Sequence, residues 1–280
     1  MKDLIVRLAE LAGPLDASGQ WPALQFELLS KAGVLGWVVP REFGGAQVSE
    51  RELLTGYVEM ASACLTTTFV LTQRHGACQR IAASDNQSLK ADLLPKLVRG
   101  EIFATVGISH LTTSRQHWRT PAVEVAEEGA AYRLNGEVPW VTGAAHADYL
   151  VTGGTLVDGR QLLATVPTTL SGVVIGPAAK LLALGASHTS SVRLDNVLLD
   201  RRFLIAGPAE QAARQTAGTG SFGTSALAVG LAQAAIDGLS AEAAVRPDLM
   251  PILDPLQQEC SALKSAIDLA ADAAAGAQDQ

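Results

Sequence analysis

The spacing of apolar residues changes twice along the chain, and this change constrains the fold more than any other feature. Residues 1–102 carry apolar side chains at helical spacing. From residue 103 to 206, short segments alternate apolar and polar residues between turns rich in Gly, Asp and Pro, which indicates strands. Residues 207–280 return to helical spacing with many alanines. We therefore predict an α+β chain with three domains: an N-terminal helical domain (1–102), a middle antiparallel β sandwich or barrel (103–206) and a C-terminal helical domain (207–280).

The composition excludes several classes of protein. Hydrophobic residues make up 48% of the 280 residues and charged residues 18%, which is typical of a folded chain and not of a disordered one. The net charge of −7 and the lack of a basic stripe argue against nucleic-acid binding. We expect no apolar run long enough to span a membrane, and the charged N-terminal segment is not typical of a signal peptide.

The chain has three widely spaced cysteines, Cys64, Cys78 and Cys260. Their number and spacing fit neither a disulfide framework nor a zinc motif. We expect reduced thiols in a cytoplasmic protein, with Cys64 and Cys78 buried in apolar helices.

Local signals fix several helix boundaries. Ser49 and Glu52 have the spacing of a capping box. The nearly uncharged stretch 61–84 predicts a single buried helix, and 86–100 predicts a short helix that ends at Gly100. Prolines at 247, 251 and 255 are expected to break the C-terminal helices.

The segment LNGEVPWVTG, residues 134–143, combines two strand signals. Asn135-Gly136 between alternating residues predicts a tight hairpin turn. Pro139 lacks a backbone donor, so this part of the strand is expected at a sheet edge or a bulge.

Familiar catalytic motifs are missing from the sequence. The five histidines show no metal-binding spacing, and scattered histidines are more often structural or exposed. The sequence contains neither a glycine-rich dinucleotide or P-loop motif nor a Gly-x-Ser-x-Gly nucleophile elbow.

Five segments, taken in order, resemble those of the acyl-CoA dehydrogenase family of flavoproteins. They read LLSKAGVLGWVVPREFGG (28–45), LPKLVRGEIFATVGIS (94–109), LNGEVPWVTGAAHAD (134–148), KLLALGASHTSSVRLDNVLL (180–199) and AVGLAQAAIDGLSAEAAVR (228–246). Together they extend over nearly all of the chain. Each is moderately specific alone, but the ordered set is specific. The family's order of helices, strands and helices is also the order that the periodicity predicts.

The resemblance implies an FAD-binding oxidoreductase and assigns residues to the flavin site. Trp140 matches the tryptophan whose ring lies against the flavin, and Thr142 matches the threonine whose hydroxyl hydrogen-bonds the flavin near its reactive nitrogen. Val141 lies between them and points the other way along the strand. Ile108 and Ser109 fall near the family's hydroxyl residue at the end of the preceding strand. An aromatic face and a hydroxyl donor suit a flavin ring.

Two further residues imply a site shared between subunits. Arg246 matches an arginine that reaches the flavin pyrophosphate of a neighbouring subunit, and Gln257 matches a glutamine that also approaches that cofactor. The resemblance thus implies a homodimer or homotetramer, with acyl-CoA as the candidate substrate. Without the ordered match, Trp140 would be interpreted as a core aromatic, Thr142 as an ordinary strand residue and Arg246 as a surface cation.

The segment after the first strand departs from the family pattern. The family has Thr-Glu-Pro-Gly-x-Gly-Ser-Asp, which helps to hold the flavin phosphates and the substrate. Here residues 108–121 read ISHLTTSRQHWRTP, with His110, Arg115 and His117 as new residues and Ser114 as a candidate for the lost serine. Val138 replaces a lysine of the family.

The family's catalytic base also finds no match. In one group of the family the matching position of this glutamate falls near Gly220-Ser221, where no carboxylate stands, and the usual thioester-binding arginine near it corresponds to Ser221. In the other group the glutamate lies in a loop between the last two long helices, which the 280 residues do not include. The C-terminal bundle is therefore expected to be partial, as in a truncated version of a longer protein or a shortened homologue.

Three functions stay open on these residues. The first is an acyl-CoA dehydrogenase-type oxidoreductase acting on a CH–CH bond of an acyl thioester or similar substrate, with no catalytic base in this chain. The second is a flavin-dependent monooxygenase on the same fold, in which Ser109 and His110 stabilise a flavin–oxygen adduct. The third is a non-catalytic homologue that binds a partner.

Overall fold

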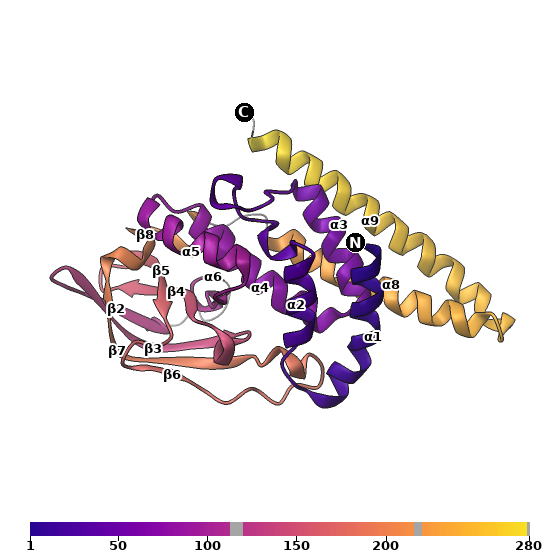
Figure 1. The fold of residues 1–280 in the computed structure, drawn as a ribbon, viewed down its shortest axis with the longest axis horizontal. Helices are drawn as coiled ribbons and strands as arrows, with labels where there is room; N and C mark the ends of the chain where they lie inside the picture. Colours follow the sequence, from indigo (N-terminus) through magenta and orange to yellow (C-terminus); the bar gives the residue numbers. More distant parts are fainter. Residues whose placement is uncertain (113–119, 216–219, 279–280) are drawn as a thin grey trace. The chain divides into compact units, whose positions relative to one another are not determined.

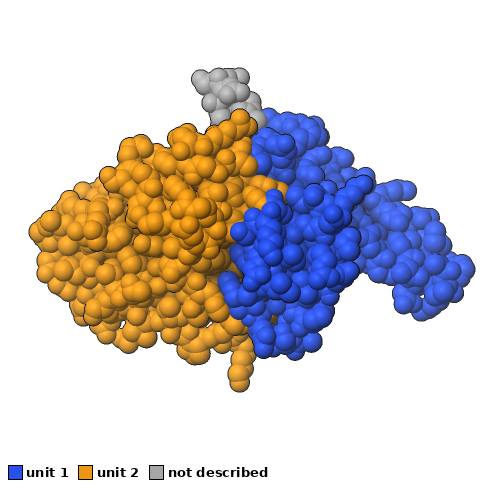
Figure 2. All heavy atoms as spheres, viewed as in Figure 1, with its two compact units in different colours: residues 1–32, 48–69, 219–280 blue, residues 33–47, 70–218 orange. Residues whose placement is uncertain are grey.

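The chain packs as two compact units in the computed structural model, which describes residues 1–112, 120–215 and 220–278 (Figure 1). Unit 1 comprises residues 1–32, 48–69 and 219–280, and unit 2 comprises residues 33–47 and 70–218 (Figure 2). Each unit thus combines segments that are far apart in the sequence.

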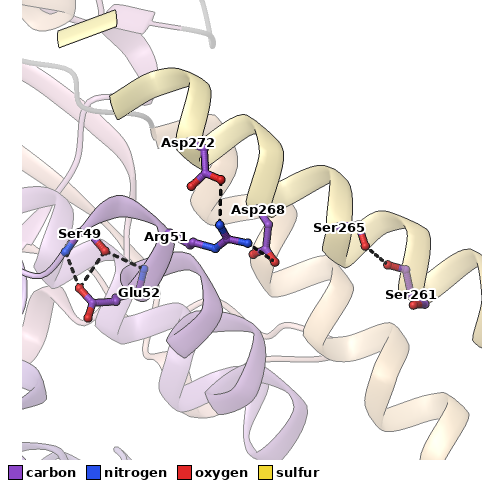
Figure 3. A network of polar contacts seen from close by, with 7 residues as sticks. All are labelled: Ser49, Arg51, Glu52, Ser261, Ser265, Asp268 and Asp272. Carbon is purple, nitrogen blue, oxygen red and sulfur yellow. Dashed lines mark hydrogen bonds and ion pairs between the residues drawn. The ribbon is translucent and has the colours of Figure 1, made fainter. Parts of the chain in front are cut away.

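Unit 1 is helical. Its elements are α1 (Lys2–Ser18), α2 (Ala23–Lys31), α3 (Glu50–Ala63), α8 (Gly220–Ala243), the 3-10 turn η6 (Pro247–Leu249) and α9 (Met250–Gln278). The predicted capping box is confirmed: Ser49 Oγ accepts from the Glu52 amide, and the Glu52 carboxylate accepts from the Ser49 amide. In the first turn of α3, Arg51 pairs with Asp268 at 3.2 Å and Asp272 at 2.8 Å, so α3 is joined to α9 (Figure 3).

Two expectations about the C-terminal helices were wrong. Pro251 and Pro255 lie inside α9, and the break is confined to η6, which Pro247 opens. Pro251 is in the first turn, where its missing N–H has no helical partner in any case. Residues Phe222–Ala243 of α8 are also long and apolar enough to cross a membrane by length and composition, with a mean hydropathy of 1.2. In this structure α8 packs against α3 and α9.

The stretch 61–84 forms two helices and not the single one predicted. Cys64 is extended, with φ −154° and ψ 96°, and separates α3 from α4 (Leu65–Ala82). The Thr67 hydroxyl lies 3.1 Å from the Cys64 thiol, and the Thr68 hydroxyl donates to the Cys64 carbonyl. Both bonds lie at the start of α4, which Cys64 directly precedes. Cys64, Cys78 and Cys260 are all buried and free.

Unit 2 contains the sheet. Its strands are β1 (Ala104–Val106), β2 (Val123–Glu128), β3 (Ala131–Val141), β4 (Tyr149–Leu156), β5 (Gln161–Pro167), β6 (Val173–Ile175), β7 (Ser190–Asp200) and β8 (Leu204–Ala209). Its helical elements, besides most of α4, are η1 (Val34–Gly36), η2 (Arg41–Phe43), α5 (Gln87–Arg99), α6 (Ser109–Thr112), η3 (Ala144–His146), η4 (Gly185–Ser187), η5 (Arg201–Phe203) and α7 (Ala212–Gln215). As predicted, α5 ends at Gly100, which adopts a left-handed conformation.

The sheet confirms the α+β class but is mixed where an antiparallel one was expected. The strand order is β6-β7-β3-β2-β4-β5-β8, and β1 and β2 both run parallel to β4 along one of its sides. Successive residues of β4 serve opposite cores: Leu150 packs among the strands, and Val151 packs with α4 and α5. Burial on both faces explains why β4 carries no charged residue.

The hairpin predicted at Asn135-Gly136 does not form. β3 runs straight through this pair, and the β2–β3 turn lies at residues 129–130. Gly136 has φ 142°, and a Cβ there would stand 2.1 Å from the Ala122 carbonyl oxygen. Pairing with β7 is irregular between Leu134 and Gly136. The glycine therefore serves a bulge with a close backbone approach.

Two buried side chains of α4 hold the segment that contains the Pro-x-x-x-Gly-Gly loop. Arg74 donates to the carbonyls of Leu35, at 2.8 Å, and Leu97. The His75 Nε2 donates to the Val34 carbonyl at 3.1 Å. Because Leu97 lies in the last turn of α5, Arg74 satisfies a carbonyl at the negative end of that helix. These bonds tie η1 to α4 and α5.

Candidate functional site

The end of β3 exposes an aromatic ring beside buried neighbours. Trp140 is 55% exposed, whereas Val138 and Val141 are fully buried and Thr142 is 5% exposed. Pairing between β3 and β7 is irregular from Val138 to Val141, so the bulge expected at Pro139 is confirmed. We call Trp140, Val141 and Thr142 the β3 wall.

The end of β1 lies against this wall. The Thr105 hydroxyl donates to the Thr142 carbonyl at 2.7 Å. A Cβ on Gly107 would stand 2.8 Å from Val141 Cγ2, so a residue without a side chain is needed for this approach. Ile108 and Ser109, both half-buried, follow at once, and Ser109 begins α6, which contacts β3. The structure thus brings together five of the predicted residues: Ile108, Ser109, Trp140, Val141 and Thr142.

A row of three hydroxyls lies behind the wall. Thr142 Oγ1 is 3.0 Å from Thr189 Oγ1, which is 2.9 Å from Ser187 Oγ. The backbone follows the same path, because the Gly143 amide donates to the Ser187 carbonyl at 3.0 Å. The sequence prediction missed Thr189 and Ser187. The hydroxyl-rich run SHTSS was their signal, but it did not reveal that they meet Thr142.

Two histidines meet beside this row. His146 Nε2 lies 2.9 Å from His188 Nδ1, and the ring centroids are 5.0 Å apart. Burial, and then the neighbouring His188, lower the pKa of His146. The pair joins the loop after Thr142 to the loop before Thr189. Within the described parts of the chain, no group of three or more His, Cys, Asp or Glu residues gathers as a metal site would require.

His110 is buried in α6, and its Nε2 lies 3.0 Å from the Gly153 carbonyl oxygen. A carbonyl can accept but not donate, so this nitrogen carries a hydrogen. This hydrogen bond from His110 Nε2 therefore links α6 to β4. Ser114, Arg115 and His117, the other residues singled out in this segment, lie outside the described residues.

Arg246 and Gln257 belong to unit 1, and their described bonds stay within it. Arg246 pairs with Asp248 at 3.1 Å at the start of η6. Gln257 is exposed on α9 and donates to the Ser240 hydroxyl at 3.4 Å. Gln257 also lines an open hollow along α9 with Asp254, Gln258, Ser261, Ala262 and Ser265. Their assignment to a neighbouring subunit's flavin stays a prediction, as does that of the β3 wall.

Comparison with known proteins finds similarity to the acyl-CoA dehydrogenases. The model of the acyl-CoA dehydrogenase N-terminal domain matches residues 6–101. A probable acyl-CoA dehydrogenase of Bacillus subtilis, YngJ, is 26% identical over 275 residues, which covers 94% of this chain and 72% of that protein.

The chain is thus similar to acyl-CoA dehydrogenases along most of its length. It also matches the mouse mitochondrial short-chain specific acyl-CoA dehydrogenase with 23% identity over 82% of the chain. That match spans 57% of the mouse protein, so the chain corresponds to little more than half the length of this family member.

Solved structures of the same fold contain flavins. A glutaryl-CoA dehydrogenase from Mycobacterium smegmatis in complex with FADH2 superposes with a TM-score of 0.81 at 20% identity, covering 98% of this chain and 74% of that one. TdsC from Paenibacillus, solved with FMN and indole, gives a TM-score of 0.85 at 17% identity, covering 97% and 74%. At these identities the likeness shows the acyl-CoA dehydrogenase fold alone.

Proposed function

We propose that the chain is an FAD-dependent oxidoreductase of the acyl-CoA dehydrogenase type that acts on a CH–CH bond of an acyl thioester. The observation that carries the proposal is the β3 wall, where an exposed tryptophan and a threonine hydroxyl stand together at the end of a strand. Similarity to acyl-CoA dehydrogenases supports the same conclusion.

Trp140 fits the flat face of a flavin. More than half of its surface is exposed although the valines at 138 and 141 are fully buried. Burying the apolar surface of an indole is favourable, and an exposed indole lacks this stabilisation. A flat ring stacked on Trp140 would bury that surface. Trp140 would then hold the ring and exclude water from one of its faces.

Thr142 fits the polar edge of the same ring. Its hydroxyl, which lies 3.0 Å from the Thr189 hydroxyl, can both donate and accept a hydrogen bond. Val141, between them, points into the core and anchors the strand. Gly107 allows β1 to close on the wall, so Ile108 and Ser109 lie near the same ring. The segment that would hold the phosphates, residues 113–119, lies outside the described residues.

A flavin bound there would supply the two-electron redox chemistry. The chain's own residues position the ring and donate to it. We propose that no carboxylate within these 280 residues accepts the α proton, because the family's base matches a position near Gly220-Ser221, where no carboxylate stands. The α proton would then pass to a base supplied from outside these residues. Two observations favour FAD over FMN as the cofactor. A similar structure contains FADH2, and Arg246 matches an arginine that binds the pyrophosphate, which FMN lacks.

A flavin titration tests the proposal. We expect the purified chain to bind FAD with a visible absorption band, and to bind FMN less tightly. Trp140→Ala should weaken FAD binding about tenfold or more, since base-type stacking on an aromatic is worth about 1–3 kcal/mol. A chain that binds neither flavin, or a Trp140→Ala variant with unchanged affinity, would contradict the proposal.

Proton exchange tests the missing base separately. A chain with a base removes the α proton of an acyl-CoA reversibly and exchanges it in heavy water. We expect the flavin-loaded chain to show no α-proton exchange with short-, medium- or branched-chain acyl-CoA. Exchange at a rate above that of buffer would show that a base is present and overturn that part of the proposal.

We also propose that the chain forms a homo-oligomer through α8 and α9. Several large apolar side chains there are exposed: Leu231, Ile252, Leu263 and Leu269. Exposed apolar surface of this kind marks interfaces. Light scattering with size-exclusion chromatography is expected to give a dimer or tetramer mass, and a monomer mass at high concentration would refute it.

A further inference from the structure

The hydrogen bonds among the three hydroxyls behind the β3 wall all donate in the same direction. Ser187, the residue farthest from the wall, sets that direction. Each hydroxyl carries one hydrogen and can both donate and accept. Ser187 is 0% exposed, so water does not reach its side chain. Among the described residues, Thr189 is the sole hydrogen-bond partner of the Ser187 hydroxyl. If Ser187 accepted from Thr189, its own hydrogen would be buried without an acceptor, which is costly. Ser187 is therefore the donor.

The same argument applies to the next bond. Thr189 is 7% exposed, and its hydroxyl contacts Ser187 on one side and Thr142 on the other. Its oxygen accepts from Ser187, so its hydrogen is satisfied only by donation to Thr142. The hydrogen of Thr142 is then the one left over in the row, beside the exposed ring of Trp140.

We propose that Ser187 and Thr189 are positioning residues that make Thr142 a hydrogen-bond donor to the bound ligand. The proposal rests on the flavin-binding function proposed above, because the ligand must present an acceptor at Thr142, such as a ring nitrogen or carbonyl oxygen of a flavin. Each bond in the row also polarises the next, so donation into the Thr142 oxygen strengthens the bond that Thr142 makes.

The test is a double-mutant cycle on flavin affinity. Thr189→Val keeps the shape of the side chain and removes the hydroxyl, and Thr142→Val does the same at the wall. We expect Thr189→Val to raise the flavin dissociation constant about three- to tenfold and to shift the visible flavin band. Thr189→Ser should restore both to within about twofold of wild type.

The energetic coupling between Thr189 and Thr142 shows whether Thr189 acts through Thr142 or only supports the local structure. If Thr189 acts through Thr142, adding Thr189→Val to Thr142→Val should change the dissociation constant by less than about twofold. Full additivity of the two effects, or an unchanged affinity and spectrum in Thr189→Val, would overturn the inference. If Thr189→Val does not fold, Ser187→Ala takes its place in the cycle, with an expected rise of about two- to fivefold and the same loss of effect on Thr142→Val.

The wild-type chain distinguishes the two levels of failure. A wild-type chain that binds neither FAD nor FMN contradicts the proposed function, and the inference falls with it. If the wild-type chain binds flavin and the Thr189 variants have the same flavin affinity and spectrum as wild type, only the inference about Thr189 is contradicted.

Discussion

Gly230 on α8 lies directly against Ala61 on α3: a Cβ built at residue 230 would stand 2.6 Å from the Ala61 Cβ and 2.6 Å from the Val58 carbonyl oxygen. The helices can approach this closely only where one of them lacks a side chain. The contact packs α3, from the N-terminal part of the chain, against α8, from the C-terminal part, and so helps to hold unit 1 together.

Gly230→Ala is therefore expected to destabilise the chain by about 1–3 kcal/mol, because the clash involves backbone that cannot rotate away. Gly238→Ala is the matched control, since it lies on the same helix and a Cβ there meets nothing within 4 Å. That variant should be neutral or up to about 1 kcal/mol more stable through helix propensity. Urea unfolding of both variants checks the pair, and equal effects would refute the close contact.

His75 predicts a pH dependence of stability. It is fully buried, and burial, followed by the charge of Arg74, lowers its pKa from 6.5 to about 3. Below about pH 6.5 the unfolded chain binds a proton there and the native chain does not. The stability due to neutral His75 is thus fully present above about pH 6.5 and is lost as the pH falls toward 3, at no more than about 1.4 kcal/mol per pH unit.

A His75→Gln variant isolates this contribution. Glutamine does not titrate, and its amide can still donate to the Val34 carbonyl. The free energy of unfolding of the variant should fall less between about pH 7 and about pH 5 than that of the wild type. Parallel curves for the two proteins would mean that His75 is protonated in the native state or that its burial is wrong.

Features that depend on a few neighbouring residues could be predicted from the sequence. The capping box at Ser49 and the helix end at Gly100 need only local hydrogen bonds, and both formed as expected. Asn135-Gly136 satisfied the same kind of local rule but failed, because the approach of Ala122 and the pairing with β7 decide the conformation of Gly136. A contact with a distant strand outweighed the turn preference.

The candidate site divides in the same way. Trp140 and Thr142 are two residues apart, so a strand places them together, and the family resemblance singled them out. Thr189 lies 47 positions after Thr142 and reaches it through the β3–β7 pairing. No local pattern encodes that meeting. The break at Cys64 was missed because the stretch 61–84 is nearly uncharged and carries no proline or glycine at that point.

Trp140 and Val141 are adjacent but should respond to substitution in opposite ways. Val141 is fully buried in the core of the sheet, so Val141→Ala should cost about 1–3 kcal/mol of stability. Trp140 is 55% exposed, so Trp140→Ala should change stability by about 0.5 kcal/mol or less in the flavin-free chain. Thermal unfolding without flavin measures both. A large loss for Trp140→Ala would make the ring part of the core and would remove the main support for a flavin wall.

Ser190 provides a further test of the packing behind the site. Its hydroxyl is buried and makes no hydrogen bond with any described residue. A buried hydroxyl without a partner opposes folding, so Ser190→Ala should be neutral or stabilise the chain by up to about 1 kcal/mol. Ser84→Ala is the matched control, because the buried Ser84 hydroxyl donates to the Ile205 carbonyl at 2.8 Å and accepts from the Asn86 amide. That variant should lose about 1–3 kcal/mol. If urea unfolding shows Ser190→Ala to be as damaging as Ser84→Ala, the Ser190 hydroxyl has a partner, and the strand start beside Thr189 is packed differently from the structure described.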